Sequence, residues 1–314
     1  MNQGIYLALD GLTGAIISVM VVANTNLGHA TTMGVSLLVN HLIGLTLVST
    51  ILFFGRKNPS IAGPKQRAPL PLYLNGMLGV LILNFNFYSF TALGSSLAMA
   101  LTVFGQSVFS LVFDLNGWLG MKKRSFSTKK VLSLAVSGLG IVVMASKGVG
   151  SFSFIYILIA FAAGAITITQ MILNSTLAIY KGPMKASQWT YIAGLSAAIP
   201  FYFLTQPAAT IEGFSKLPEV PFIHIIAGGV LSVTVLISTA FVIVKLPAIY
   251  SALLLSASQI LASVAIDAFF LKMFSPNLLL GAILMLLGMA GNLLADRSST
   301  ESKEIPPAEE ETLP

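Results

Sequence analysis

The stretch "GQSVFSLVFDLNG", Gly105–Gly117, is apolar apart from a few polar side chains spaced four residues apart. They are Gln106, Ser110 and Asp114. Further along, Ser258–Phe270 reads "SQILASVAIDAFF" and repeats this spacing with Gln259, Ser263 and Asp267. On a helix of 3.6 residues per turn, each set forms one polar stripe. A polar stripe in an apolar helix must face protein or water, so both stripes predict a membrane-spanning helix with a protein-facing or water-facing side.

The composition places the whole chain in the membrane. Of 314 residues, 55% are hydrophobic and 9% are charged, with a mean hydropathy of +0.88. Soluble domains carry about 25% charged residues, so these charges are too few to cover a water-soluble surface. The formal net charge of +6 reflects short basic loops rather than a nucleic-acid interface. The absence of cysteine excludes disulfides, thiol catalysis and thiolate metal sites.

Ten apolar runs are long enough to cross a bilayer, for which a helix needs about 20 residues. Continuous hydrophobicity favours helices over barrel strands, and the first run is full length, so it is read as a retained span rather than a signal peptide. The predicted spans are 4–24, 32–54, 70–91, 95–119, 130–147, 153–175, 185–205, 222–244, 248–271 and 276–295.

Basic residues predict the orientation. If the N-terminus lies on side A, fourteen of the seventeen Lys and Arg residues fall on side A and three, Lys147, Lys216 and Lys272, fall on side B. Cytoplasmic loops are the basic ones, so both termini are expected in the cytoplasm. The polar segment 296–314, "DRSSTESKEIPPAEEETLP", is expected to be a disordered acidic cytoplasmic tail; a partner-binding peptide is the alternative.

The chain also contains an internal repeat. Laying residues 1–150 over 151–295 pairs Gly14 with Gly164, Asn24 with Asn174, and Gly44 with Gly194. With a small shift of frame, Gly76 pairs with Gly229, and the two polar stripes coincide. Polar residues inside spans are rare, so this match is stronger than matching glycines. Since each half has five spans, the second half must enter the membrane upside down, and inverted repeats are a transporter architecture.

These features resemble the drug/metabolite transporter superfamily and, within it, the YdcZ-type family in its fused ten-helix form. The family pattern has Gln and Asn four apart, then Gln followed eight residues later by Asp with a Gly nearby. Gln170 and Asn174 match the first element, while in the other half Met20 replaces the Gln that should precede Asn24. Gln106, Asp114 and Gly117 match the second element, and Phe270 replaces the Gly beside Asp267. The resemblance implies a small-molecule permease of the cytoplasmic membrane, with the two striped helices lining a central cavity.

Asp114 and Asp267 have two possible roles. Both lie near the C-terminal ends of their helices, where the helix dipole and burial disfavour negative charge, so each could take up a proton or a cationic amine in turn. They would then act as gate or coupling sites, with Gln106 and Gln259 as hydrogen-bonding partners. Alternatively they are anchors: Asp114 to a neighbouring helix or the loop Lys122–Arg124, and Asp267 to Lys272.

Other polar residues of the spans are weaker candidates. Asp10 is expected to be an interfacial carboxylate in the N-terminal half of its helix. Asn24 and Asn174 are expected to cap helix ends, Gln170 to reach a cavity, and His41 to pack with a hydrogen bond rather than relay protons. In "NFNFYSF", Asn84–Phe90, the residues Asn84, Asn86 and Tyr88 cannot all share one face, so only some are expected at a cavity.

The sequence therefore predicts a secondary active transporter, an exporter or exchanger working by alternating access. Three intramembrane acids and no central Lys or Arg favour a neutral or cationic organic solute, with protons as a possible coupling ion. No phosphate-binding loop or metal-ligand set is evident, so no cofactor, metal or nucleic acid is expected, and the chain is expected not to be an enzyme. A lipid-modifying enzyme and a non-transporting assembly protein are the alternatives. The residues leave the oligomeric state open.

Overall fold

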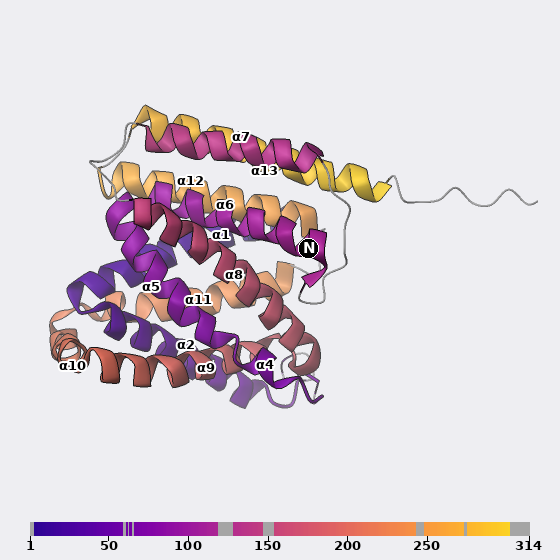
Figure 1. The fold of residues 1–314 in the computed structure, drawn as a ribbon. Helices are drawn as coiled ribbons and strands as arrows, with labels where there is room; N and C mark the ends of the chain where they lie inside the picture. The colour runs from indigo at the N-terminus through magenta and orange to yellow at the C-terminus, as the bar shows by residue number, and fades with distance from the viewer. Residues whose placement is uncertain are drawn as a thin grey trace, which may run out of the picture.

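The computed structural model of the chain is a bundle of helices, most of which run roughly along one direction while α5 and α8 cross the others obliquely (Figure 1). The structure describes residues 3–58, 61, 63, 64, 66–118, 128–146, 154–242, 248–272 and 275–301. Its helices are α1 (Gln3–Ala30), α2 (Met33–Gly55), α4 (Leu70–Tyr73), α5 (Gly76–Leu93), α6 (Ser95–Asn116), α7 (Thr128–Ala145), α8 (Phe154–Lys181), α9 (Pro183–Thr205), α10 (Pro207–Lys216), η2 (Leu217–Glu219), α11 (Phe222–Val242), α12 (Ala248–Phe269) and α13 (Pro276–Glu301).

A helix lies at each of the ten predicted places, with α4 and α5 together forming the third. Seven helical segments among the described residues are long and apolar enough to cross a membrane, and α12 and α13 contain shorter apolar segments, Leu253–Phe269 and Pro276–Asn292. The remaining helix, α9, is 23 residues long but less hydrophobic, since Lys185, Gln188 and Pro200 interrupt it. The last helix runs to Glu301, past the predicted boundary at 295, and residues 302–314 lie outside the described part of the chain.

Glycines at two corners let the chain reverse direction without a linker. Gly94 joins α5 to α6 with a φ of 80°, and Gly182 joins α8 to α9 with a φ of 82°. Side chains other than glycine rarely adopt this conformation. The tight corners place α5 beside α6, and α8 beside α9, as antiparallel neighbours.

The repeat is visible in the packing, because contacts occur in pairs that exchange when each residue is replaced by its repeat mate, the equivalent residue of the other half. A Cβ atom at Gly14 of α1 would lie 2.2 Å from the carbonyl oxygen of Leu255 in α12. A Cβ atom at Gly164, the mate of Gly14, would lie 2.0 Å from the carbonyl oxygen of Thr102, the mate of Leu255. The contact between α1 and α12 is therefore repeated between α8 and α6.

The same exchange occurs where the two halves meet. Between α2 and α9, Gly44 packs on the ring of Tyr191, and its mate Gly194 packs on the ring of His41, the mate of Tyr191. Those two rings meet edge to face at 5.9 Å. Between α7 and α13, Gly140 and Gly281 approach each other's backbone, so these two helices lie side by side (Figure 1).

These close approaches make a testable prediction about stability. Replacing Gly164 or Gly14 by alanine should lower the free energy of unfolding by about 1–3 kcal/mol each, because the added methyl group meets backbone that cannot move aside. Thermal unfolding in detergent would measure the loss. Gly4→Ala is the control, since nothing lies within 4 Å of a Cβ atom there. Equal melting temperatures for the three variants would contradict the tight packing.

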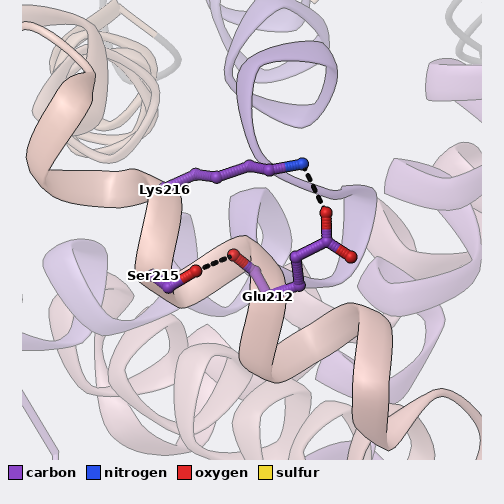
Figure 2. Close-up of polar contacts among 3 residues, drawn as sticks. All are labelled: Glu212, Ser215 and Lys216. Atoms are coloured by element: carbon purple, nitrogen blue, oxygen red, sulfur yellow. Dashed lines mark hydrogen bonds and ion pairs between the residues drawn. The ribbon is translucent and has the colours of Figure 1, made fainter.

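The helix α10 lies at the end of the bundle opposite the N-terminus, which is side B (Figure 1). Its Gly213 packs on Thr32 at the start of α2. Glu212 and Lys216 form an exposed ion pair of 2.7 Å one turn apart (Figure 2). The hydrogen bond and charge of Lys216 lower the pKa of the Glu212 carboxyl. An exposed pair of this kind adds little stability, and α10 is held mainly by its packing on α2 and α9.

Candidate functional site

Asp267 binds the beginning of another helix. Near the end of α12, its carboxylate accepts hydrogen bonds from the backbone N–H groups of Ser95, at 3.1 Å, and Ser96, at 2.7 Å. The Ser95 hydroxyl also donates to it. Asp267 is only 2% exposed. The sequence-based expectation considered only the C-terminal end of α12, which disfavours negative charge. The N-terminus of α6 also lies at Asp267, and it stabilises negative charge. These contacts are those of an anchor between α6 and α12.

Asp114 forms a buried ion pair with Lys130, in the first turn of α7. The Lys130 Nζ lies 3.6 Å from the Asp114 Oδ2, and the two residues are 5% and 8% exposed. Asp114 is in the last turn of α6, so the pair joins α6 to α7. The partner suggested by the sequence, Lys122–Arg124, lies outside the described residues.

The remaining members of the two stripes differ in burial. Gln259 and Ser263 are buried; the backbone oxygen of Gln259 accepts a 2.7 Å hydrogen bond from Ser18 of α1, and the Ser263 hydroxyl donates to Ile260. Gln106 and Ser110 are half-buried. The first stripe therefore retains accessible polar groups in the second half of α6, and the second stripe is enclosed by protein.

Gln170 and Asn174 belong to a polar cluster that the sequence did not predict as a whole. The Thr190 hydroxyl of α9 lies 2.9 Å from the Asn75 Oδ1 and 3.0 Å from the Asn174 Oδ1. The Gln170 Nε2 donates to the backbone oxygen of Asn75 at 3.2 Å. The Gln170 side chain thus contacts the turn between α4 and α5, and its position at a cavity stays a prediction. Thr190 is the mate of Asn40 in the repeat, and this match of two polar residues inside spans is the sequence signal that could have identified Thr190.

In the other half, Asn24, the mate of Asn174, lacks these side-chain hydrogen bonds. Asn24 and Asn86 are 7% and 8% exposed; both amide atoms of Asn24 and the Oδ1 of Asn86 are buried without a hydrogen-bond partner. They line a small hollow of about 10 Å³ between α1, α2 and α5, together with Ser36 and Thr25. The capping expectation for Asn24 and Asn174 is wrong, because α1 continues to Ala30 and α8 to Lys181, so both asparagines lie inside helices.

Above this hollow, α1 and α5 pack together at side B. The ring of Phe87 packs on Gly28, and the His29 ring lies 4.9 Å from it. The His29 Nε2 is 3.0 Å from the Thr91 hydroxyl. Among the described residues, the mates of these helices, α8 and α11, make no comparable packing contact, and Ile179, the mate of His29, is 71% exposed. We call the contact between α1 and α5 the side B seam.

The other candidates have separate positions. His41 is buried and its Nδ1 donates to the backbone oxygen of Leu37 at 3.0 Å, as expected for a packing role. Asn84 accepts a 2.8 Å hydrogen bond from the Tyr202 hydroxyl, and Tyr88 is exposed. Asp10 lies in the N-terminal half of α1, as expected, and is 1% exposed, so protein encloses it; its interfacial depth in the membrane stays a prediction.

A larger hollow of about 520 Å³ lies between α5, α6 and α8, lined by residues of the second half of α6 other than those of the stripe. Its walls include three aromatic side chains, Phe109, Phe113 and Trp118, and the hydroxyl-bearing Thr169. The repeat mates of the three aromatics are Ala262, Ile266 and Leu271. The aromatic lining therefore belongs to one half alone and was not predicted by the repeat.

Comparisons with known proteins agree with this fold. The sequence profile described as "Putative inner membrane exporter, YdcZ" matches twice, over residues 5–143 and 155–291. No curated protein sequence is significantly similar to the chain. A solved structure titled "Crystal structure of protein" has a similar fold, with a TM-score of 0.60 and 15% sequence identity, covering 93% of this chain and 98% of that one.

Proposed function

The chain belongs to the YdcZ family of inner membrane exporters, and on that premise we propose that it is a secondary active transporter working by alternating access. Its cargo is a small neutral or cationic organic solute, exported or exchanged across the inner membrane. The proposal rests on the pairs of contacts that exchange between the two halves. One contact, between α1 and α5 at the side B seam, has no comparable counterpart between α8 and α11 among the described residues. The family match supports transport over the lipid-modifying enzyme and the assembly protein.

The exchanging contacts support two halves in opposite orientations, each of five spans. Such halves can adopt two conformations, and swapping the conformations turns a bundle open on one side into one open on the other. The two forms then differ little in energy, as a transport cycle requires. With the basic loops on side A, both termini lie in the cytoplasm.

The broken pair of contacts supports one particular state of the cycle. On side B, α1 and α5 meet at Gly28 and Phe87, while among the described residues α8 and α11 make no comparable packing contact on side A. On this proposal the protein is in a state that is closed on side B and more open on side A. Transport would exchange these arrangements, by parting α1 from α5 and bringing α8 to α11.

The buried asparagines keep the seam from closing too firmly. Both amide atoms of Asn24 and the Oδ1 of Asn86 lack a hydrogen-bond partner in the hollow below the side B seam. A buried polar group without a partner costs about 1–3 kcal/mol. Opening side B returns water to them and recovers that energy. Asn174, the mate of Asn24, is already paired with Thr190, so the two halves are suited to different steps.

The hollow between α5, α6 and α8 is the proposed position for the organic part of the cargo. Phe109, Phe113 and Trp118 offer apolar faces to which an organic cation is also attracted. Gln106 and Ser110 lie half-buried on the same half of α6 and are proposed hydrogen-bonding partners for the cargo. Asp114 and Asp267 are proposed as anchors, because their carboxylates are engaged with Lys130 and with the start of α6.

Reconstitution in liposomes tests the function. A panel of amines, amino acids and sugars would first be screened for thermal stabilisation, and positive compounds then tested for protein-dependent uptake and proton flux. We expect Phe109→Ala and Phe113→Ala to weaken uptake, and Ile266→Ala, at the mate of Phe113, to change it little. Uptake unaffected by both Phe variants would place the cargo elsewhere, and no uptake of any compound by folded protein would contradict transport.

The side B seam makes a separate prediction. Phe87→Ala removes the ring that packs on Gly28 and His29, and should shift the population toward the state open on side B. The chain has no cysteine, so Thr25→Cys introduces a single reporter, buried at the hollow. A membrane-impermeant maleimide added from side B should label this cysteine about tenfold faster in the Phe87→Ala background.

The control for that labelling experiment is Phe54→Ala, a ring that is 80% exposed and away from the seam. It should leave the rate unchanged. Equal labelling in the Phe87→Ala and Phe54→Ala backgrounds would mean that the contact between α1 and α5 does not close side B.

A further inference from the structure

A groove on the outside of the bundle has a composition different from the rest of its surface. It encloses about 350 Å³ between α4, the start of α5 and α9. Its apolar floor is made by Leu74, Met77 and Ile192. Leu74 and Met77 are 44% and 40% exposed, so the groove opens away from the bundle.

The mouth of the groove is aromatic and basic. Tyr73 and Trp189 meet edge to face, with ring centroids 5.0 Å apart. The Lys181 Nζ lies over the ring of Tyr73, 5.8 Å from its centre. A positive charge beside the Tyr73 ring thus adjoins a groove that has two amphipathic rings and an apolar floor.

The groove begins at the side A surface. Lys181 is the last residue of α8, and Trp189 lies about two turns into α9, which begins at Pro183. Tyr and Trp gather at this depth in membrane proteins, where their rings meet the lipid headgroups. Basic pockets between helices on the cytoplasmic side bind the headgroups of anionic lipids.

We propose that this groove binds one anionic phospholipid. The lipid phosphate pairs with Lys181, the glycerol region rests on Tyr73 and Trp189, and one acyl chain lies along Leu74, Met77 and Ile192. Charge complementarity at the mouth and apolar surface along the floor together select this occupant. A free phosphate would use the lysine and leave the floor uncovered.

The repeat supports a dedicated site, because the chemistry is missing from the equivalent positions on side B. The mates of Lys181, Tyr73 and Trp189 are Thr31, Ile226 and Val39. The fold alone therefore does not require a lysine and two aromatic rings here. The inference concerns lipid binding and does not rest on the proposed transport function.

Fluorescence of the full chain tests the proposal directly. The chain has two tryptophans, so Trp118→Phe leaves Trp189 as the reporter. In mixed micelles, phosphatidylglycerol with brominated acyl chains should quench Trp189 at several-fold lower concentration than brominated phosphatidylcholine with the same chains. Melting temperature should rise by about 2 °C with phosphatidylglycerol and stay constant with inorganic phosphate.

Two lysine variants distinguish a specific lipid-binding site from general electrostatic attraction of an anionic lipid to the protein. Lys181→Gln should remove the preference for phosphatidylglycerol while leaving the weaker quenching by phosphatidylcholine. Lys216→Gln removes an exposed lysine of side B, paired with Glu212, and should retain the preference (Figure 2). Equal quenching by the two lipids in the Trp118→Phe protein, equal effects of the two lysine variants, or stabilisation by phosphate alone would each overturn the proposal.

Discussion

Asp267→Ala is expected to lower the free energy of unfolding by about 3 kcal/mol, one of the two largest losses predicted for this chain. The variant leaves the N–H groups of Ser95 and Ser96 without their buried acceptor, and the Ser95 hydroxyl keeps only the backbone oxygen of Ser263. It also removes the negative charge from the N-terminus of α6. Thermal and denaturant unfolding in detergent would measure the loss.

Two variants refine this prediction. Asp267→Asn keeps one oxygen acceptor but turns an N–H₂ group toward one donor, so it should lose about half as much. Ser95→Ala removes a single hydroxyl and should cost about 1 kcal/mol. The same Asp267→Asn protein separates anchoring from coupling: an anchor predicts normal uptake per folded molecule, whereas a coupling site predicts lost uptake or altered pH dependence at near-normal stability.

Sequence patterns predicted the helices well because apolar length decides them. A run of about 20 apolar residues has to satisfy its backbone internally in lipid, so it forms a helix whatever its neighbours do. The repeat was also predictable, since Gly14, Gly44 and the two polar stripes recur in both halves. Helix ends were less predictable: α1 and α8 extend well past Asn24 and Asn174, so the apolar run ends before the helix does.

The partners of polar residues were mostly not predictable, because they come from segments distant in the sequence. The sequence places Asp267 near the end of α12, but only the packing of α12 on α6 brings it to Ser95. Likewise, Asn24 and Asn174 look equivalent in the repeat. The structure separates them, because Thr190 can donate to Asn174 and the side-chain amide of Asn24 has no hydrogen-bond partner.

The buried pair of Asp114 and Lys130 should give the other large effect. Removing one partner of a buried ion pair leaves an uncompensated charge and costs about 3–5 kcal/mol. Asp114→Ala is therefore expected to destabilise the protein by about that amount. Lys130→Met should also destabilise it, because it removes the buried ammonium group that lies beside the Asp114 carboxylate.

A double variant shows whether the pair or its parts matter. Asp114→Leu with Lys130→Met replaces both charges by apolar groups of similar size, which is often neutral or stabilising in a protein interior. The double variant should therefore recover most of the stability lost by either single variant. The interaction energy of the double-mutant cycle should exceed about 2 kcal/mol, which is at the upper end of the usual range of about 0.5–3 kcal/mol for contacting residues. Single losses below about 1 kcal/mol that simply add would instead describe a solvent-screened surface pair. Because the pair joins the end of α6 to the start of α7, its loss should also free α6 at side A, near Phe113 of the hollow between α5, α6 and α8.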